Sequence, residues 1–82
     1  MKYFVYILKS IKDSSFYIGY TKNLDRRLSE HNEGRSRYTA RKAPWKLYYF
    51  EEHENKRDAI KRELFLKRQR NITFFEGLRK EK

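Results

Sequence analysis

The chain has 82 residues, the size of one small domain, and its 21 Lys and Arg against 11 Asp and Glu leave a net charge of +10. So large a basic excess argues against an enzyme of neutral metabolites and indicates a polyanionic partner. The absence of cysteine excludes disulfides, a thiolate zinc site, a cysteine nucleophile and an iron–sulfur cluster. The longest apolar run, residues 3–8, is too short for a membrane span or a signal peptide, so we expect one cytoplasmic domain over residues 1–82 with no membrane partner.

A β-hairpin is predicted at the N-terminus. Residues 3–9 and 16–21 are rich in β-branched and aromatic types, and the segment between them has turn composition. Symmetry of that loop predicts an antiparallel register in which opposite positions sum to about 23. Tyr6 then lies opposite Tyr17, and Phe4 lies opposite Gly19, where the aromatic ring covers a glycine inside a strand.

A helix of about ten residues is predicted after the hairpin. Leu24 and Leu28 are four residues apart, Asn23 suits the N-cap position, and Gly34 is a stop signal. The segment 34–44 resembles a basic loop, because it is rich in Arg and ends at the only proline.

A third strand and a second long helix complete the predicted order, β-β-α-β-α. The predicted fold class is therefore α/β, of the α+β type. Residues 45–52 have strand composition. Asn55 suits an N-cap, with Asp58 three residues later, and the helix reaches about Arg70. Only residues 79–82 are expected to fray.

The positive charge is concentrated in two blocks. Residues 22–46 hold eight basic and three acidic side chains, and residues 56–70 hold seven and two. If the fold brings these blocks together, they form one phosphate-binding surface; otherwise each is an ordinary solvated face. The candidate nucleic-acid contacts are Arg26, Arg35, Arg37, Arg41, Lys42, Lys56, Lys67 and Arg70.

Several catalytic classes are excluded by motif. The two histidines are 22 positions apart, and there is no His-Glu-x-x-His, phosphate-binding glycine loop or Gly-x-Ser-x-Gly. On the first predicted helix, Arg27 and His31 are four residues apart and therefore share a face. Arg27 suits a phosphate contact, and the alternative is a helix ion pair with Asp25 or Glu30.

Glu63 stands out on the second long helix. Helical geometry places it between apolar residues and in a row of basic ones. Such a carboxylate could ligate Mg²⁺ at a phosphodiester, and the alternative is an i,i+4 pair with Lys67.

Two strand tyrosines are further candidates. Facing each other beside Arg27, Tyr6 and Tyr17 would have their pKa lowered by the nearby cation, which would allow one of them to accept a proton from water. The core is expected to include Tyr3, Tyr48, Tyr49 and Trp45, and the alternative role for Trp45 is base stacking.

The order of these residues resembles the GIY-YIG nuclease domain. Tyr17-Ile18-Gly19 matches the second triplet, and Phe4-Val5-Tyr6 stands in place of the first with its tyrosine kept. The spacing to Arg27, and the later Thr39, Pro44-Trp45, Glu51 and Arg62-Glu63, are similar to the small stand-alone bacterial members, relatives of the excision-repair nuclease domain.

This resemblance implies a three-stranded antiparallel sheet flanked by helices and an endonuclease that uses one Mg²⁺ or Mn²⁺ ion, with DNA repair or processing as the setting. Tyr6 and Tyr17 would help activate water, Arg27 would neutralise phosphate charge, and Glu63 would bind the metal. His31 and Gly19 would have supporting roles. DNA is the expected substrate, with any specificity supplied by a homodimer or another partner. The alternatives are a non-catalytic DNA- or RNA-binding module and a ribosome-associated basic protein.

Overall fold

The protein is built on one three-stranded antiparallel sheet with the strand order β2-β1-β3. The computed structural model describes residues 2–35, 37–69 and 71–80. The strands are β1 (Tyr3–Ser10), β2 (Phe16–Thr21) and β3 (Trp45–His53), so all three predicted strands are confirmed. Among the described residues, no helix combines the length and the apolar character that crossing a membrane requires.

The predicted register of the hairpin is wrong by two residues. Tyr6 pairs with Gly19, and Leu8 pairs with Tyr17. Ser10 is the reason: its hydroxyl donates to the carbonyl of Lys42 and accepts the Lys12 and Asp13 N–H groups, so the strand continues to Ser10 and the chain turns there. A shift of two keeps every side chain on its predicted face, because side chains alternate with period two.

Two helices pack beside the hairpin. Helix α1 (Leu24–Asn32) begins at its predicted N-cap, where the Asn23 side chain accepts the Arg26 N–H at 3.0 Å. The segment expected to be a loop contains the short helix α2 (Arg37–Ala40), which corrects the prediction. A single turn has little stability alone, but Thr39 is fully buried and its carbonyl accepts the indole N–H of Trp45 at 2.9 Å.

The C-terminal third forms two helices rather than one. Helix α3 (Lys56–Arg68) has the predicted Asn55 cap and ends two residues earlier than expected. Helix α4 (Ile72–Lys80) was not predicted. Phe75 and Leu78, three residues apart on α4, are buried in a core shared with the sheet and α3. This packing stabilises a helix whose sequence carries only weak signals of its ends. Residues 79–80, expected to fray, belong to α4, and Arg70 and residues 81–82 lie outside the described part of the chain.

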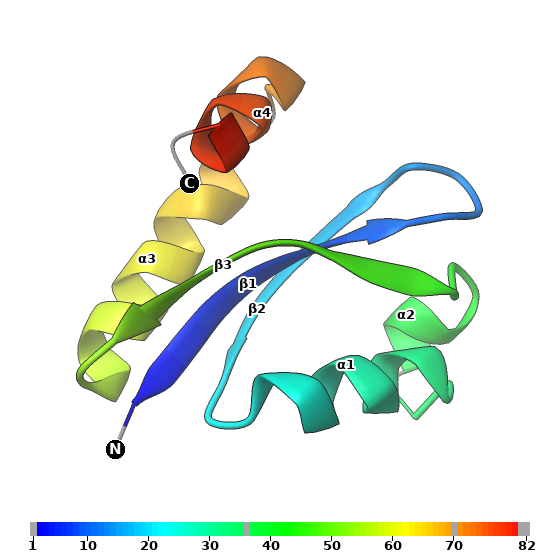
Figure 1. Cartoon of the computed structure of the whole chain (residues 1–82), viewed down its shortest axis with the longest axis horizontal. Coiled ribbons are helices and arrows are strands. Elements are labelled where there is room, and N and C mark those ends of the chain that lie inside the picture. The colour runs from blue at the N-terminus through cyan, green and yellow to red at the C-terminus, as the bar shows by residue number, and fades with distance from the viewer. Residues whose placement is uncertain (1, 36, 70, 81–82) are drawn as a thin grey trace.

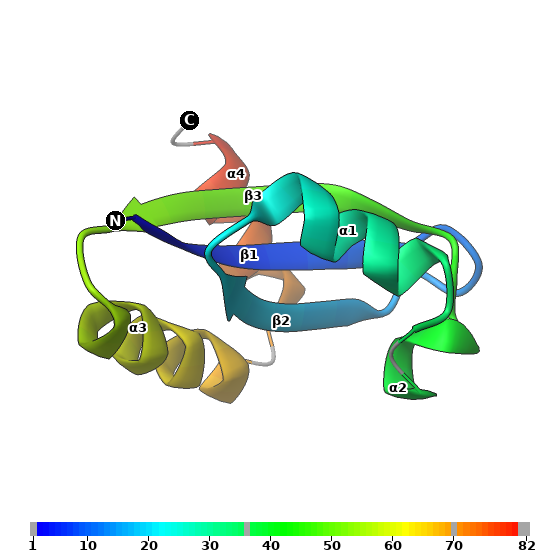
Figure 2. The ribbon, with the colours of Figure 1, turned by 90° about the horizontal axis from the view of Figure 1, so that it is seen from below.

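Helices cover both faces of the sheet (Figure 1). Central strand β1 has side chains buried on both faces, because Val5 and Ile7 point to a core shared with α3 and α4, whereas Tyr6 and Leu8 point to a core shared with α1. Figure 2 shows β1 between β2 and β3, with α1 lying across one face. Trp45 and Tyr48 are buried as predicted, and Tyr3 and Tyr49 are half-buried at the edge of the core.

Glu51 on β3 makes three hydrogen bonds, one of which joins β3 to α3. Its carboxylate accepts the Tyr49 hydroxyl at 2.6 Å and the Arg62 Nε–H at 2.8 Å, and it lies 2.7 Å from His53 Nε2. Burial alone would raise the pKa of Glu51, but these contacts together lower it. Because Arg62 lies on α3, this network ties β3 to the helix that carries Glu63.

We expect Glu51→Gln to lower the free energy of unfolding by about 1–3 kcal/mol, because the charged acceptor of several partly buried donors is lost. Glu52→Gln is the matched control. Its side chain is 49% exposed and, among the residues that the structure describes, forms an ion pair with Lys2 alone, whereas that of Glu51 is 16% exposed. The control should therefore stay within about 0.5 kcal/mol. Urea denaturation measures both variants, and equal losses would contradict the assigned role of Glu51.

Candidate active site

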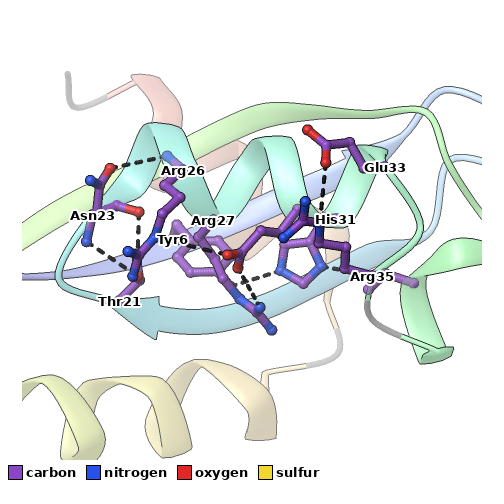
Figure 3. Close-up of polar contacts among 10 residues, drawn as sticks. Tyr6, Thr21, Asn23, Arg26, Arg27, His31, Glu33 and Arg35 are labelled. Atoms are coloured by element: carbon purple, nitrogen blue, oxygen red, sulfur yellow. Dashed lines mark hydrogen bonds and ion pairs between the residues drawn. The ribbon is translucent and has the colours of Figure 1, made fainter.

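Tyr6 stands at the centre of the candidate site. It lies on β1, is only 2% exposed, and its hydroxyl lies 3.0 Å from Nε2 of His31. Gly19, its cross-strand partner, makes room for the ring: a Cβ there would lie 2.7 Å from the Tyr6 hydroxyl oxygen. The glycine inside β2 is therefore covered by Tyr6, and not by Phe4 as predicted. Figure 3 shows Tyr6, Arg27 and His31 gathered between α1 and the strands.

His31 extends this contact into the protein interior. The imidazole is fully buried, and its Nδ1 lies 2.8 Å from the Thr39 hydroxyl. Burial lowers the pKa of His31, and the positive charge of Arg27 lowers it further, against a smaller opposing effect of Glu30. A neutral imidazole with one nitrogen facing Tyr6 can accept or donate a proton there.

Arg27 lies one turn before His31 and is about one-third exposed. Its Nη1 donates to Glu30 Oε1 at 2.9 Å, so the ion pair that sequence reasoning left as an alternative does form. Arg27 also lowers the pKa of Tyr6, but burial has the larger and opposite effect and raises that pKa to about 12. The expectation of a lowered pKa is wrong for Tyr6, because the cost of burying a phenolate exceeds the gain from one cation.

Tyr17 lies between Tyr6 and the protein surface. Its ring centroid is 4.9 Å from that of His31, 6.4 Å from Tyr6 and 6.2 Å from Trp45. Although the register differs from the prediction, Tyr6 and Tyr17 still lie on one face of the sheet. They are diagonal neighbours there, and not directly opposite each other as was predicted. Tyr17 is half-buried, so it presents an edge to solvent beside the buried Tyr6.

Glu63 approaches from α3, on the other side of the sheet from α1. Its side chain is 14% exposed, and its Oε2 lies 3.7 Å from Lys67 Nζ, which is the predicted i,i+4 pair. Burial has the largest effect in raising the pKa of Tyr6, and the charges of Tyr17 and then of Glu63 raise it further.

A single carboxylate limits the metal this site can hold. Within the described part of the chain, no group of three or more His, Cys, Asp or Glu side chains could hold a metal ion. Mg²⁺ keeps several water ligands and is commonly held by one or two carboxylates together with substrate phosphates. Glu63 therefore fits an ion completed by water and a phosphodiester, and it does not fit an all-protein metal site.

Comparison with known proteins shows the family of the chain. Residues 2–74 match the model of the GIY-YIG catalytic domain. The chain belongs to the GIY-YIG family. Among its relatives, a UPF0213 protein of Clostridium perfringens is 50% identical over 66 residues, covering 79% of this chain and 70% of the relative. The UPF0213 protein of Bacillus licheniformis is 40% identical over 67 residues, covering 80% and 68%.

A solved structure shows the same fold. The solution NMR structure of the UPF0213 protein from Bacillus halodurans has a TM-score of 0.56 and 32% sequence identity, and the match covers 93% of this chain and 81% of that one. Small single-domain bacterial proteins therefore share both the sequence pattern and the sheet with its flanking helices. The matched residues 2–74 include every described candidate catalytic residue and only the start of α4.

The two basic blocks lie largely on opposite faces of the GIY-YIG sheet, because the first includes α1 and the second forms α3. Arg26 and Arg35 are exposed and pair with Glu30 at 3.8 Å and with Glu33 at 3.2 Å. Lys42 pairs with Asp13 at 3.5 Å. The remaining described candidates are exposed on α2, just after it, or on α3: Arg37, Arg41, Lys56 and Lys67. Lys56 begins α3 and Lys67 lies in its last turn, about 16 Å away along the helix axis. Of these two lysines, Lys67 is the one that lines a groove beside Tyr17.

Sequence reasoning missed two contributors. Thr39 positions His31, and Tyr38 contacts Tyr17, yet both lie in the segment expected to be a basic loop. Thr39 carried a signal, because it is part of the family resemblance. Nothing in the local sequence distinguishes Tyr38 from an ordinary loop tyrosine.

The buried His31 predicts a pH-dependent stability. Its pKa is lower in the folded protein than the unfolded value of about 6.5, so the unfolded chain binds more protons as pH falls below about 6.5. The stability supplied by the neutral imidazole is therefore complete above that pH and is lost on acidification toward the folded pKa.

We expect wild-type protein to lose free energy of unfolding between about pH 7 and pH 5, and His31→Gln to lose less. Carboxyl groups with a lowered pKa, such as those of Glu51 and Glu30, change the free energy of unfolding only below their unfolded pKa of about 4.5. Their titration therefore does not overlap the range between about pH 7 and pH 5. Denaturant midpoints measured at several pH values check the difference. Parallel pH profiles for the two proteins would show that His31 is not the titrating group.

Proposed function

We propose that this domain is a divalent-metal-dependent endonuclease that hydrolyses phosphodiester bonds of DNA, with a role in DNA repair or processing. The observation that carries the proposal is the convergence of Tyr6, Arg27 and His31 on one face of the sheet. Membership of the GIY-YIG family and the net charge of +10 support a nucleic-acid substrate.

Tyr6 and His31 form the proposed path for the proton of the attacking water. With a pKa raised to about 12, Tyr6 is protonated at neutral pH and cannot begin as a free phenolate. When Nδ1 of His31 donates to the Thr39 hydroxyl, Nε2 is free to accept the Tyr6 proton. Water then gives its proton to the Tyr6 oxygen as Tyr6 passes its own to His31. The hydroxide equivalent attacks phosphorus, and the bond to the leaving oxygen breaks.

The remaining residues position charge around this step. Arg27 is about one-third exposed and is held by Glu30, so its guanidinium is oriented and still able to bind a phosphate oxygen. Tyr17 lies beside the buried Tyr6 and orients the attacking water. A Mg²⁺ or Mn²⁺ ion on Glu63 would supply charge neutralisation at the leaving oxygen.

A cleavage panel tests the proposal. Single-stranded, duplex, flapped and branched DNA, with matching RNA, are incubated with the wild type in Mg²⁺, Mn²⁺ or EDTA. We expect metal-dependent cleavage of DNA that EDTA abolishes. Salt-dependent binding without cleavage in any metal would instead establish the non-catalytic binding module, and preference for RNA would overturn the assignment of DNA.

A further inference from the structure

A groove follows the exposed edge of β2 next to the candidate active site. It has a volume of about 620 Å³, within the range of about 300–1,000 Å³ typical of ligand sites. Its walls come from β2, α2, the end of α3 and α4, and its lining residues are Phe16, Tyr17, Ile18, Tyr38, Lys67 and Phe75, together with Gln69. The groove therefore runs from a candidate catalytic tyrosine to the lysine that pairs with Glu63.

Tyr38 is an exposed aromatic ring in a fixed position. It is 63% exposed, and its ring centroid lies 5.9 Å from that of Tyr17. Its neighbour Thr39 is fully buried against His31, which anchors the single turn that carries Tyr38. A large ring that is both exposed and anchored loses little conformational entropy when a ligand stacks on it.

We propose that Tyr38 is a stacking platform for one unpaired base of single-stranded DNA that enters this groove. Every base has a π-face that can stack on an aromatic side chain. In a duplex those faces are covered by neighbouring base pairs, so the platform selects unpaired strands, flaps or frayed ends. This inference rests on the proposed function, because it places the base beside the phosphate that Arg27 and Glu63 would act on.

The charges around Tyr38 suit the backbone of such a strand. Arg37 and Arg41 lie on either side of it in sequence and are exposed, and within residues 2–35, 37–69 and 71–80 neither has an ion-pair partner. Lys67 supplies positive charge on the opposite wall. An aromatic surface with basic residues on both sides is the pattern of single-strand binding.

A second hollow of about 460 Å³ lacks these properties. It lies beside α4 and is lined in part by Lys9, Tyr48 and Arg79. Its tyrosine is buried, and its ring is occupied by Arg79 at 4.9 Å and by Lys9 at 5.8 Å from the centroid. A base therefore cannot stack on the Tyr48 ring. The groove beside β2 differs because its Tyr38 ring is exposed.

Binding measurements without metal separate this inference from catalysis. Fluorescence anisotropy is recorded for the full chain with a labelled single-stranded oligonucleotide and with the duplex of the same sequence, at constant salt. We expect Tyr38→Ala to weaken single-strand binding about tenfold and duplex binding less than twofold, and Tyr38→Phe to retain affinity. The matched control is Phe65→Ala, because Phe65 is an exposed aromatic on α3 outside the groove, and it should change neither affinity by twofold.

An abasic oligonucleotide identifies the contact as base stacking. It keeps the phosphate backbone, so Tyr38→Ala should lose its effect on an abasic strand. Equal losses on single strands and duplex, or an unchanged single-strand affinity, would overturn the platform, and near-ultraviolet circular dichroism shows whether the variant is folded. If Tyr38 governs single-strand binding but no DNA is cleaved, the platform stands and the endonuclease fails. If DNA is cleaved without any effect of Tyr38, only the platform fails.

Discussion

Replacing Glu63 with glutamine should abolish DNA cleavage while DNA binding stays within a few fold of wild type. The amide keeps the size of the side chain but removes the negative charge that would hold Mg²⁺ or Mn²⁺. Loss of a single charge-stabilising group in an active site typically slows the reaction by about 10²–10³-fold. The fold should persist, because the pair with the half-exposed Lys67 contributes only about 0.2–0.5 kcal/mol. Nicking of supercoiled plasmid measures the rate, and anisotropy measures the affinity.

Glu33→Gln is the matched control for this experiment. Glu33 caps the end of α1, is 57% exposed and pairs with Arg35 at 3.2 Å, so the same change of charge occurs away from Tyr6. It should leave the rate of nicking within about twofold, since substitutions of exposed surface residues are nearly neutral. Cleavage that survives Glu63→Gln at the rate of this control would remove Glu63 from the chemistry and with it the assigned metal ligand.

Gly19→Ala should destabilise the protein by about 1–3 kcal/mol and lower the rate of cleavage at least tenfold. A Cβ at this position would lie 2.7 Å from the Tyr6 hydroxyl oxygen and 2.9 Å from its ring carbon Cζ. The Tyr6 ring has little freedom to move away, because it is 2% exposed and hydrogen-bonded to His31. Any shift that relieves the overlap also disturbs the contact between Tyr6 and His31. Thermal or urea unfolding and the nicking rate report the two effects separately.

Gly77→Ala tests whether this cost comes from the Tyr6 contact. Gly77 lies in α4, and a Cβ there would meet nothing within 4 Å. The same substitution should therefore stabilise the protein by up to about 1 kcal/mol through helix propensity. The two glycine variants are thus expected to differ in the sign of their effect on stability.

A double-mutant cycle with Tyr6→Phe completes the test of the Gly19 contact. Tyr6→Phe removes the closest atom, so Gly19→Ala should cost less in that background, with a coupling energy of at least about 0.5 kcal/mol. Purely additive effects on the free energy of unfolding would show that Tyr6 and residue 19 do not restrict each other.

Local sequence signals predicted most of the elements. The caps at Asn23 and Asn55 and the composition of the three strands suffice because they depend on residues within a few positions. The register of the hairpin was wrong because it depends on Ser10, whose hydroxyl partner is the distant carbonyl of Lys42. Helix α4 was missed because its stability comes from burying Phe75 and Leu78 against residues far away in the sequence.

By itself, the sequence determined the family, through motifs in order at family spacing. It predicted a polyanionic partner from the net charge of +10, and the resemblance pointed to the candidate set Tyr6, Tyr17, Arg27 and Glu63. Composition and the order of motifs along the chain need no knowledge of long-range contacts. Only the tertiary structure decided that Glu63 approaches from the opposite side of the sheet and that Gly19 makes room for Tyr6. It also reversed the expected direction of the Tyr6 pKa, because burial depends on what the whole fold packs around the hydroxyl, whereas the neighbouring arginine is visible in the sequence.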